Sequence, residues 1–289
     1  MDGFISQIQR YSTKDGPGVR STVVAVGCPL NCLWCAYPEL SGDAAKFLYH
    51  PRRCVACGAC VAQAGGALAN SENGFEESSV LCFYDAYEMA GEPISDKELA
   101  SALLQDKVHY DRSGGGVTFS GGDPVQQTEF FFEVATRLKD SDVHVALDTS
   151  GHFPWEKLVP LVTVCDLILF DIKFLNRTLH RRYTGVDNQL ILENAMKIAY
   201  SGKPMVVRMI LVPGVNDSFT EISGRLAFVK SLGGLVRLDI IKYKKLEAGK
   251  YASLDMIELM GGTDECSDEF AERVLEMAKS IGLNATIVS

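Results

Sequence analysis

The chain has 289 residues, of which 47% are hydrophobic and 22% are charged, as expected for one well-filled globular domain with room for a small insertion. Its formal net charge is −9 and it has no cluster of lysine and arginine, which argues against a nucleic acid or an anionic membrane as its partner. It has no run of about 18 apolar residues and no basic and then apolar N-terminal segment, so neither a membrane span nor a secretion signal is predicted.

Short apolar, β-branched runs alternate along the chain with segments of helical periodicity. The runs predict strands over Ser21–Val26, Gly116–Phe119, Val143–Leu147, Leu167–Asp171, Met205–Leu211 and Val236–Ile241. Helical spacing covers Asp96–Gln105, Gln127–Lys139, Asn188–Tyr200, Thr220–Leu232 and Asp268–Ile281. The repeated order of strand and helix predicts an α/β fold with a parallel sheet, most simply a complete or partial barrel formed by residues 1–49 and 93–289.

Polar or glycine-rich segments directly follow five of the predicted strands. They are Gly27–Cys35, Ser120–Pro124, Asp148–Gly151, Asp171–Lys173 and Pro213–Asp217. In such barrels the carboxyl ends of the strands meet on one face, and ligands bind there. The sequence therefore predicts one active site assembled from these five segments.

Three cysteines lie within eight residues of one another after the first predicted strand: Cys28, Cys32 and Cys35. A structural zinc site uses four protein ligands and a complete 4Fe–4S cluster binds four cysteines, so three thiolates leave one metal position open. The alternatives are a zinc site completed by a distant histidine such as His50, and structural cysteines that meet by chance. The close spacing favours a metal site with an open position. The odd total of nine cysteines fits a reducing, anaerobic cytoplasm better than a disulfide framework.

Residues 50–92 interrupt the alternation of strands and helices. This segment contains Cys54, Cys57 and Cys60, glycine-rich turns, and then Cys82. We interpret it as a small insertion with its own metal-ligand spacing.

Several motifs together resemble one known family. They are Ile8–Arg20 with its Asp15-Gly16-Pro17-Gly18 core, the cysteine loop, Gly115–Pro124, Leu147–Gly151, Asp171–Lys173, Tyr183–Asn188 and Arg208–Asp217. The spacing Cys-x3-Cys-x2-Cys, with Trp34 before the last cysteine, is that of radical S-adenosylmethionine (SAM) enzymes. The whole set resembles the glycyl-radical-enzyme activating enzymes, the pyruvate formate-lyase activase group of that superfamily. This resemblance implies a partial (β/α)6 TIM-type barrel with a ferredoxin-like insertion.

The resemblance also implies the roles of the site residues. Cys28, Cys32 and Cys35 would bind a 4Fe–4S cluster whose free iron is chelated by SAM. The residues implied to bind this cofactor are Trp34, Gly121, Gly122, Asp123, Asp148, Thr149, Asp171, Lys173 and Arg208. Among them, Asp148, Thr149 and Asp171 match positions that bind a monovalent cation, and carboxylate and hydroxyl oxygens suit that role. Lys173 and Arg208 match positions that meet the negative end of the cofactor, for which Arg has a bidentate fork.

The implied reaction is removal of a hydrogen atom from a backbone glycine of a partner enzyme. Asp15, Gly16 and Lys173 are the residues expected to take part in it, and Asp15–Gly18 is expected to lie across the barrel mouth as a peptide-facing loop. We expect an electron donor such as flavodoxin or ferredoxin, a monomer, and a cytoplasmic location. Two rival functions are a radical SAM enzyme that acts on a small molecule and a non-catalytic iron–sulfur protein.

The insertion departs from the family pattern of two ferredoxin-type cysteine runs. Ala64 stands where the first run would have its fourth cysteine, and only Cys82 remains of the second run. The other ligand positions hold Asp85, Glu88 and Glu92. Because each fourth cysteine binds the other cluster in such ferredoxins, a second insertion cluster is excluded. The remaining alternatives are one cluster that uses Cys54, Cys57, Cys60 and Cys82, a three-thiolate cluster completed by Glu92 or water, a zinc knuckle, or an empty relic.

The chain also departs from the family at two places near the expected adenosine end of the cofactor. Ala36-Tyr37 follows the third cysteine where His-Asn is usual, and Lys244 stands where a histidine is common. Ala36, the Gly-Gly-Asp-Pro segment and Lys242 are similar to activators of arylacetate decarboxylases.

Overall fold

The computed structural model describes residues 1–59, 82–233, 237–245 and 248–288. Within these ranges, one sheet has nine strands in the order β11-β10-β9-β8-β7-β6-β2-β1-β5. Its parallel strands include β2 (Arg20–Ala25), β6 (Gly116–Gly121), β7 (His144–Thr149), β8 (Leu167–Asp171), β9 (Met205–Leu211) and β10 (Arg237–Lys242). These six strands confirm the six predicted ones to within a few residues, although predicted Val236 lies outside the described residues.

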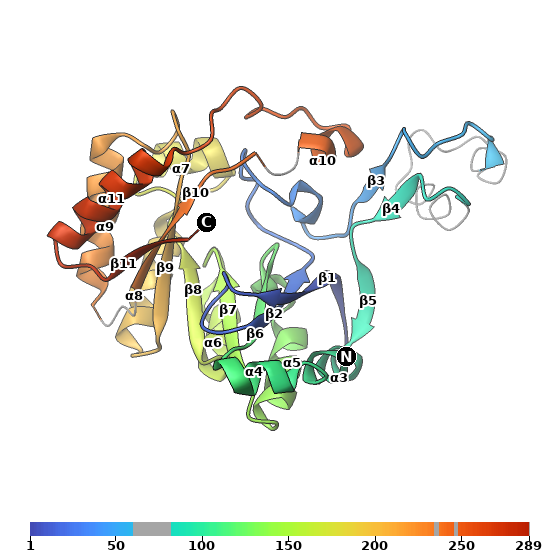
Figure 1. Cartoon of the computed structure of the whole chain (residues 1–289), viewed down its shortest axis with the longest axis horizontal. Coiled ribbons are helices and arrows are strands. Elements are labelled where there is room, and N and C mark those ends of the chain that lie inside the picture. The colour runs from blue at the N-terminus through green and yellow to red at the C-terminus, as the bar shows by residue number, and fades with distance from the viewer. Residues whose placement is uncertain (60–81, 234–236, 246–247, 289) are drawn as a thin grey trace.

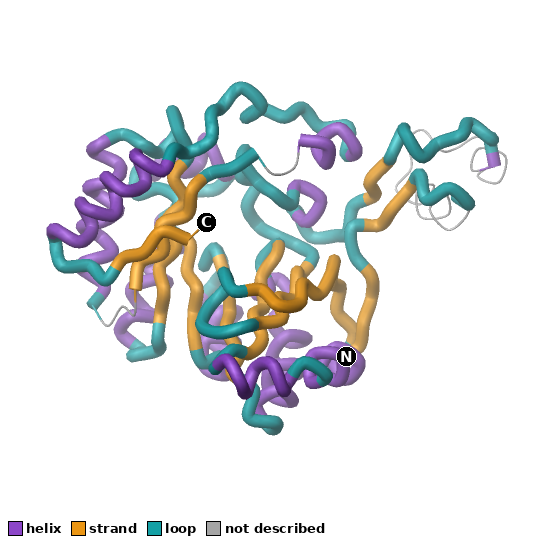
Figure 2. Tube along the Cα trace, in the orientation of Figure 1, coloured by secondary structure: helices purple, strands orange, loops and turns teal. Residues whose placement is uncertain are grey.

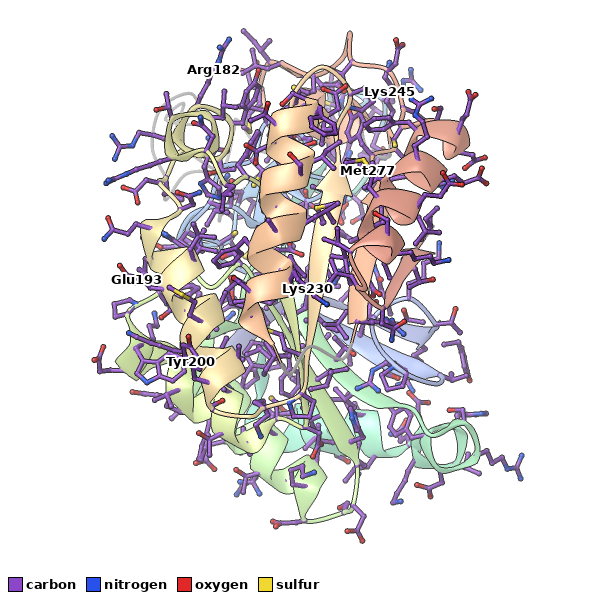
Figure 3. The ribbon with its side chains drawn as sticks, turned by 90° about the vertical axis from the view of Figure 1, so that its left-hand side faces the viewer. Arg182, Glu193, Tyr200, Lys230, Lys245 and Met277 are labelled. Carbon is purple, nitrogen blue, oxygen red and sulfur yellow. The ribbon has the colours of Figure 1, made fainter. Side chains whose placement is uncertain are left out.

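The sheet curves strongly but has two free edges, β5 and β11, so it forms a partial barrel (Figures 1 and 2). The described helices are α3 (Asp96–Leu104), α4 (Lys107–Ser113), α5 (Thr128–Lys139), α6 (Trp155–Val164), α7 (Arg177–Thr184), α8 (Gln189–Tyr200), α9 (Phe219–Leu232), α10 (Ala248–Ser253) and α11 (Asp268–Ser280). They lie mainly on the outer side of the sheet, except α10, which packs against η1 (Pro38–Leu40) and β3 (Phe47–Tyr49) near the strand ends (Figure 1). Figure 3 looks onto this outer layer, where Lys230 of α9 and Met277 of α11 lie over the strands. The partial barrel predicted from the sequence is confirmed.

Local sequence signals explain where several helices begin. Ser95 caps α3 in a capping box with Glu98, and Ser218 and Ser267 cap α9 and α11 with their hydroxyl groups. In α11 the buried residues Ala271, Val274 and Ala278 recur at helical spacing. Of the described helices, none is long and apolar enough to cross a membrane.

Three strands of the sheet were not predicted. β1 (Asp2–Ser12) runs antiparallel to β2, β5 (Glu92–Ser95) runs antiparallel to β1, and β11 (Ala285–Val288) runs parallel to β10. β1 carries polar side chains such as Gln7 and Gln9 and is largely solvated, so it lacks the apolar run typical of a buried strand. β5 and β11 have four residues each, which is too short for a periodicity argument.

A short antiparallel pair of strands projects from the barrel where the predicted insertion, residues 50–92, begins (Figure 1). The two strands are β3 (Phe47–Tyr49) and β4 (Tyr87–Met89). Glu88 of β4 accepts from His50, the residue after β3, at 3.0 Å. Cys54 and Cys57 are exposed, and Cys82 is half-buried and accepts a hydrogen bond from the Ala86 amide. Cys60 and Ala64 lie outside the described residues.

Candidate active site

A cavity of about 340 Å³ opens at the carboxyl ends of the parallel strands, and the cysteine loop forms one of its walls. Cys28, Cys32 and Cys35 all line it. Burial raises the pKa of Cys28 and Cys35 above the usual thiol range, and it raises that of Cys32 to about 12. Three half-buried thiols on one wall therefore stay protonated unless a cation compensates their charge, as a bound metal does.

The start of the cysteine loop is held by the segment that follows η1 (Pro38–Leu40), a short 3-10 helix. Cys28 and Gly42 exchange two backbone hydrogen bonds of 2.9 Å, and the Gly27 amide donates to Leu40 at 3.1 Å. The end of the loop is held by α10. Tyr251 donates its hydroxyl to the Cys35 carbonyl at 2.9 Å. These contacts fix both outer cysteines.

A partly buried ion pair strengthens the contact between α10 and the cysteine loop. Lys250 Nζ lies 2.6 Å from Glu39 Oε1, and Glu39 is almost fully buried. The same ammonium lies 4.5 Å from the centre of the Tyr37 ring, a cation–π geometry. The sequence reasoning missed Lys250 and Tyr251, because more than 200 residues separate them from the loop.

The two glycines at the end of β6, Gly121 within the strand and Gly122 after it, allow the ends of β6 and β2 to come together. Gly121 has φ +100°, and a side chain there would meet the Ala25 amide nitrogen at 2.6 Å. A side chain on Gly122 would meet the Gly27 carbonyl oxygen at 2.3 Å. Both glycines also line the cavity. Their lack of side chains therefore serves the packing of β6 against β2 as well as the approach of a ligand.

Four charged side chains face the cavity, three from β7, β8 and β9 and one from the loop after β8. Arg208 donates to Asp148 Oδ2 at 2.7 Å, and Ser120 donates to the same oxygen at 2.6 Å. Lys173 donates to Asp171 Oδ2 at 2.6 Å, while Arg208 Nε lies 3.9 Å from Asp171 Oδ1. All five residues line the cavity. The site can therefore hold a ligand that carries both positive and negative groups.

The two carboxylates of this cluster have different electrostatic surroundings. Burial and the neighbouring Asp171 raise the pKa of Asp148 to about 6, although Arg208 opposes the shift. Burial also acts on Asp171, but attraction to Lys173 and Arg208 outweighs it and lowers the pKa of Asp171. Asp171 therefore stays ionised under conditions in which Asp148 is close to protonation.

Asp123 does not line the cavity, and its side chain is fully buried. It caps η2 (Pro124–Gln127) by accepting from the Val125 amide at 3.2 Å. It also accepts from Thr149 Oγ1 at 2.9 Å and from the Ser150 amide at 2.8 Å. Thr149 and Ser150 do line the cavity. Asp123 therefore contacts the site through these two residues, which join the end of β6 to the end of β7.

The Asp15–Gly18 loop lies at the base of the barrel, and the prediction that it lies across the mouth was wrong. The Asp15 carbonyl accepts from Thr118 Oγ1 at 2.7 Å, and its carboxylate accepts from Thr22 Oγ1 at 2.8 Å. A side chain on Gly18, which has φ +67°, would meet the Gly115 backbone nitrogen at 2.4 Å. The loop precedes β2 and packs where β6 begins, because the chain enters both strands at their amino ends.

Arg20 holds this loop from inside the barrel. It is fully buried and donates to the Pro17 carbonyl at 3.1 Å, the Val117 carbonyl at 2.5 Å and Thr118 Oγ1 at 2.6 Å. A side chain on Gly16, which has φ +125°, would lie 3.2 Å from the Arg20 side chain. Gly16 therefore sits directly against the guanidinium stem that supports the loop.

Trp34 is fixed by an aromatic cluster behind the cysteine loop. Its ring centre lies 5.9 Å from that of Phe174 and 6.4 Å from that of Tyr183, and these two rings stack on each other at 5.6 Å. Trp34 also lines the cavity. The cluster holds the residue before the third cysteine in one orientation.

The cavity gathers most of the site residues predicted from the sequence. Those that line it are Cys28, Cys32, Trp34, Cys35, Gly121, Gly122, Asp148, Thr149, Asp171, Lys173 and Arg208. Asp15, Gly16 and Asp123 lie outside its lining, as do Cys54, Cys57 and Cys82 of the insertion. Further lining residues without a predicted role include Ser150, Ile210 and Tyr243. Their position at the ends of β7, β9 and β10 is the sequence feature that could have identified them as lining residues.

The chemistry of the cavity fits a 4Fe–4S cluster with SAM beside it. Three thiols on one wall match a cluster with one free iron, and the facing acidic and basic side chains match the amino and carboxylate groups of a methionine. Throughout the described part of the chain, no three His, Cys, Asp or Glu side chains converge on a point where they could hold a single ion.

Comparison with known proteins gives the class to which this fold and cavity belong. The sequence model of the Radical SAM superfamily matches residues 22–223. This range runs from β2 into α9 and contains the cysteine loop and all four charged cavity residues. The chain belongs to the radical SAM superfamily.

Curated relatives identify the group within this superfamily to which the chain belongs. The chain is 34% identical to the isethionate sulfite-lyase activating enzyme of Nitratidesulfovibrio vulgaris, over 90% of both chains. It is 33% identical to the 4-hydroxyphenylacetate decarboxylase activating enzyme of Clostridioides difficile, over 88% of this chain and 86% of that one. A solved domain of pyruvate-formate lyase-activating enzyme from Bacteroides vulgatus is 28% identical, with a TM-score of 0.52 over 61% of this chain and all of that domain. Within the superfamily, the chain belongs to the glycyl-radical-enzyme activating enzymes.

Proposed function

We propose that this protein uses SAM to place a radical on a backbone glycine of a partner enzyme. The observation that carries the proposal is that three cysteines of one loop line the same cavity as paired acidic and basic side chains. The similarity to activating enzymes extends over about nine tenths of the chain, which supports the same activity for the whole protein. The identities of 34% and 33% to activators of two different enzymes do not single out a partner.

The site residues have distinct tasks in this proposal. Cys28, Cys32 and Cys35 hold the cluster, and Arg208 and Lys173 orient the negative end of SAM by charge-assisted hydrogen bonds. When bound, the cluster and SAM supply a one-electron cleavage that yields a carbon radical able to remove a hydrogen atom. The walls of the cavity exclude water from this radical.

Asp15 is proposed to position the target peptide from the base of the barrel. Its Oδ2 is already occupied by Ser12 and Thr22, each at 2.8 Å, and its Oδ1 points toward Arg208 at 4.0 Å. That second oxygen can accept a backbone N–H of the peptide and so fix the glycine relative to the cofactor.

We further propose a monovalent cation and one auxiliary cluster. Asp148, Thr149 and Asp171 offer oxygen atoms for the cation next to the SAM carboxylate. Residues 50–92 would form the insertion and hold at most one cluster through Cys54, Cys57, Cys60 and Cys82. The barrel would comprise the remaining residues, 1–49 and 93–289.

The proposed setting is a reducing cytoplasm in which the protein acts as a monomer. A low-potential carrier such as flavodoxin or ferredoxin would supply the electron. The eight described cysteines are all free thiols, which supports a reducing compartment.

The test is anaerobic reconstitution of the protein with iron and sulfide, reduction, and addition of SAM. Cleavage of SAM excludes a non-catalytic protein. Mixing with its cognate glycyl radical enzyme should then give the doublet electron-paramagnetic-resonance signal of a glycyl radical. Cleavage of SAM without that doublet on any glycyl radical enzyme, but with a product from a small molecule, would contradict the proposal.

A further inference from the structure

The segment Tyr183–Asn188 has no role in the chemistry described above, yet it contacts two walls of the cavity. It includes the last residues of α7, the turn that follows, and the residue before α8. Arg182 of α7 and Lys245 after β10 lie at the same end of the molecule in Figure 3. The segment is therefore close to the end where the cavity opens.

The first contact is with the cysteine loop. The Asn31 amide donates to the Thr184 carbonyl at 2.8 Å, and the Leu33 amide donates to the Tyr183 carbonyl at 3.0 Å. The last carbonyls of an α-helix have no partner within the helix. The amides on either side of Cys32 thus satisfy free carbonyls of α7, and the middle cysteine is fixed by the end of this helix.

The second contact is with the loop that carries Lys173. Asn188 is buried, and its Nδ2 donates to the carbonyls of Phe174 and Leu175 at 2.9 and 2.8 Å. Phe174 directly follows Lys173, and its ring stacks on Tyr183. One short segment therefore holds both Cys32 and the loop of the cofactor-facing lysine.

The segment is itself rigidly built. Thr184 is fully buried and donates its hydroxyl to the His180 carbonyl at 2.8 Å. His180 Nδ1 lies 2.7 Å from the Val186 carbonyl, which can only accept, so this nitrogen carries the proton. Gly185 ends α7 with φ +83°, a conformation that residues with a side chain rarely adopt.

We propose that Tyr183–Asn188 is the positioning element that sets the cysteine loop at a fixed distance from Asp171 and Lys173. It holds the metal ligand Cys32 on one side and the cofactor-facing loop on the other. The inference rests on the proposed function, because it assumes that a cluster and SAM meet between these two walls. His180, Thr184, Gly185 and Asn188 are positioning residues, since none of them lines the cavity.

The test compares Gly185→Ala with Gly202→Ala in the reconstituted protein. Gly202 also has a positive φ, +73°, and a side chain there meets nothing within 4 Å. It lies before β9, at the end of the sheet opposite the cavity. Both substitutions place a side chain at a positive φ, so both should strain the backbone and lower the melting temperature. Only the substitution at Gly185 should disturb the cysteine loop.

For Gly185→Ala we expect the backbone amides of residues 28–35 to exchange hydrogen faster, by about 10-fold or more. We also expect a change in the electron-paramagnetic-resonance spectrum of the reduced cluster with SAM. SAM cleavage should slow by about 10- to 100-fold, the usual effect of small misplacements of reacting groups. Gly202→Ala should show none of these three changes. If Gly185→Ala lost only thermal stability, the positioning role would be wrong.

A second pair of variants, at Thr184, tests the proposal if Gly185→Ala does not fold. Thr184→Ser keeps the hydroxyl that bonds His180, whereas Thr184→Val keeps the shape and removes it. We expect Thr184→Ser to retain the exchange pattern and the cluster spectrum, and Thr184→Val to change both. Equal behaviour of the two variants would overturn the proposal. None of these readouts requires the partner enzyme, so absence of a glycyl radical with the unmodified protein would refute the proposed function alone.

Discussion

Asp15 Oδ1 lies 4.0 Å from Arg208 Nη1, and the same nitrogen donates to Asp148 Oδ2 at 2.7 Å. This guanidinium connects the loop at the base of the barrel with the cavity at its mouth. A peptide bound at Asp15 and a cofactor bound beside Asp148 would therefore share one network of charges.

Replacing Asp15 should separate SAM cleavage from formation of the glycyl radical on the partner enzyme. We expect Asp15→Ala to lose the glycyl radical on the partner enzyme while SAM cleavage continues slowly, because Asp15 lies outside the cavity lining. Asp15→Asn, which keeps an acceptor oxygen, should retain part of the signal. Spin quantification of the radical doublet, beside chromatography of the cleavage products, checks this. A full doublet in Asp15→Ala would assign the loop a purely structural role.

Replacing Arg208 should weaken SAM binding. Arg208→Ala removes a charged partner, with an expected cost of about 1–3 kcal/mol in binding free energy. Arg208→Lys should lose less, because it keeps the charge but not the planar fork. Calorimetric titration of the reconstituted protein with SAM measures the effect, with the exposed Arg112 as a control for Arg→Ala. Normal affinity in Arg208→Ala would show that this residue does not contact the cofactor.

Replacing any cysteine of the loop should abolish SAM cleavage without unfolding the barrel. Each of Cys28→Ala, Cys32→Ala and Cys35→Ala removes one of only three thiolates on the cavity wall. Cys266→Ala provides the control, since Cys266 lies outside the cavity lining. Circular dichroism tests the fold, and the product assay tests the site. Cleavage that persisted in Cys32→Ala would contradict the cluster assignment.

The iron content should reveal what the insertion holds. With one cluster in the barrel and one in the insertion, the reconstituted protein should contain roughly eight irons per chain, and not about twelve. A variant with all three loop cysteines changed to alanine should retain about four. Iron analysis together with protein quantification by amino-acid analysis measures this. A value near zero in the variant would mean that the insertion binds no iron.

His144 should make the protein less stable in acid. Burial lowers the pKa of His144, and its Nδ1 faces Arg20 at 3.3 Å, so protonation is disfavoured in the folded state. The unfolded chain binds this proton near pH 6.5, and the stabilisation is lost as the pH falls below that value. His144→Gln cannot titrate, so the wild type should lose stability relative to it between about pH 7.5 and 5.5. Denaturant unfolding at several pH values tests this, and a constant difference would contradict it.

Much of the barrel could be predicted because its parallel strands are buried on both faces. Strands such as Leu167–Asp171 are continuous apolar runs, and their polar ends identify the face where ligands bind. The chain order of these strands also matches their order in the sheet between β6 and β11. For this reason, residues from Cys28 to Arg208 could be placed in one site from sequence alone.

The remaining features depend on contacts that local patterns do not encode. Side-chain direction after a strand cannot be derived from periodicity, so the turn of Asp123 away from the cavity was not foreseen. The position of the Asp15–Gly18 loop depends on Arg20, a charge buried against three partners inside the barrel. Lys250 and Tyr251 reach the cysteine loop only through the tertiary fold.

The contacts from α10 have a consequence for the order in which the protein matures. Synthesis proceeds from the N-terminus, so a nascent chain contains all three loop cysteines long before it contains Lys250 and Tyr251. Until those residues leave the ribosome, Glu39 has no ionic partner there and the Cys35 carbonyl lacks its hydroxyl donor. The metal ligands made first thus receive their final support from a segment translated more than 200 residues later. Iron delivered before that point would bind to a cysteine loop that lacks these contacts.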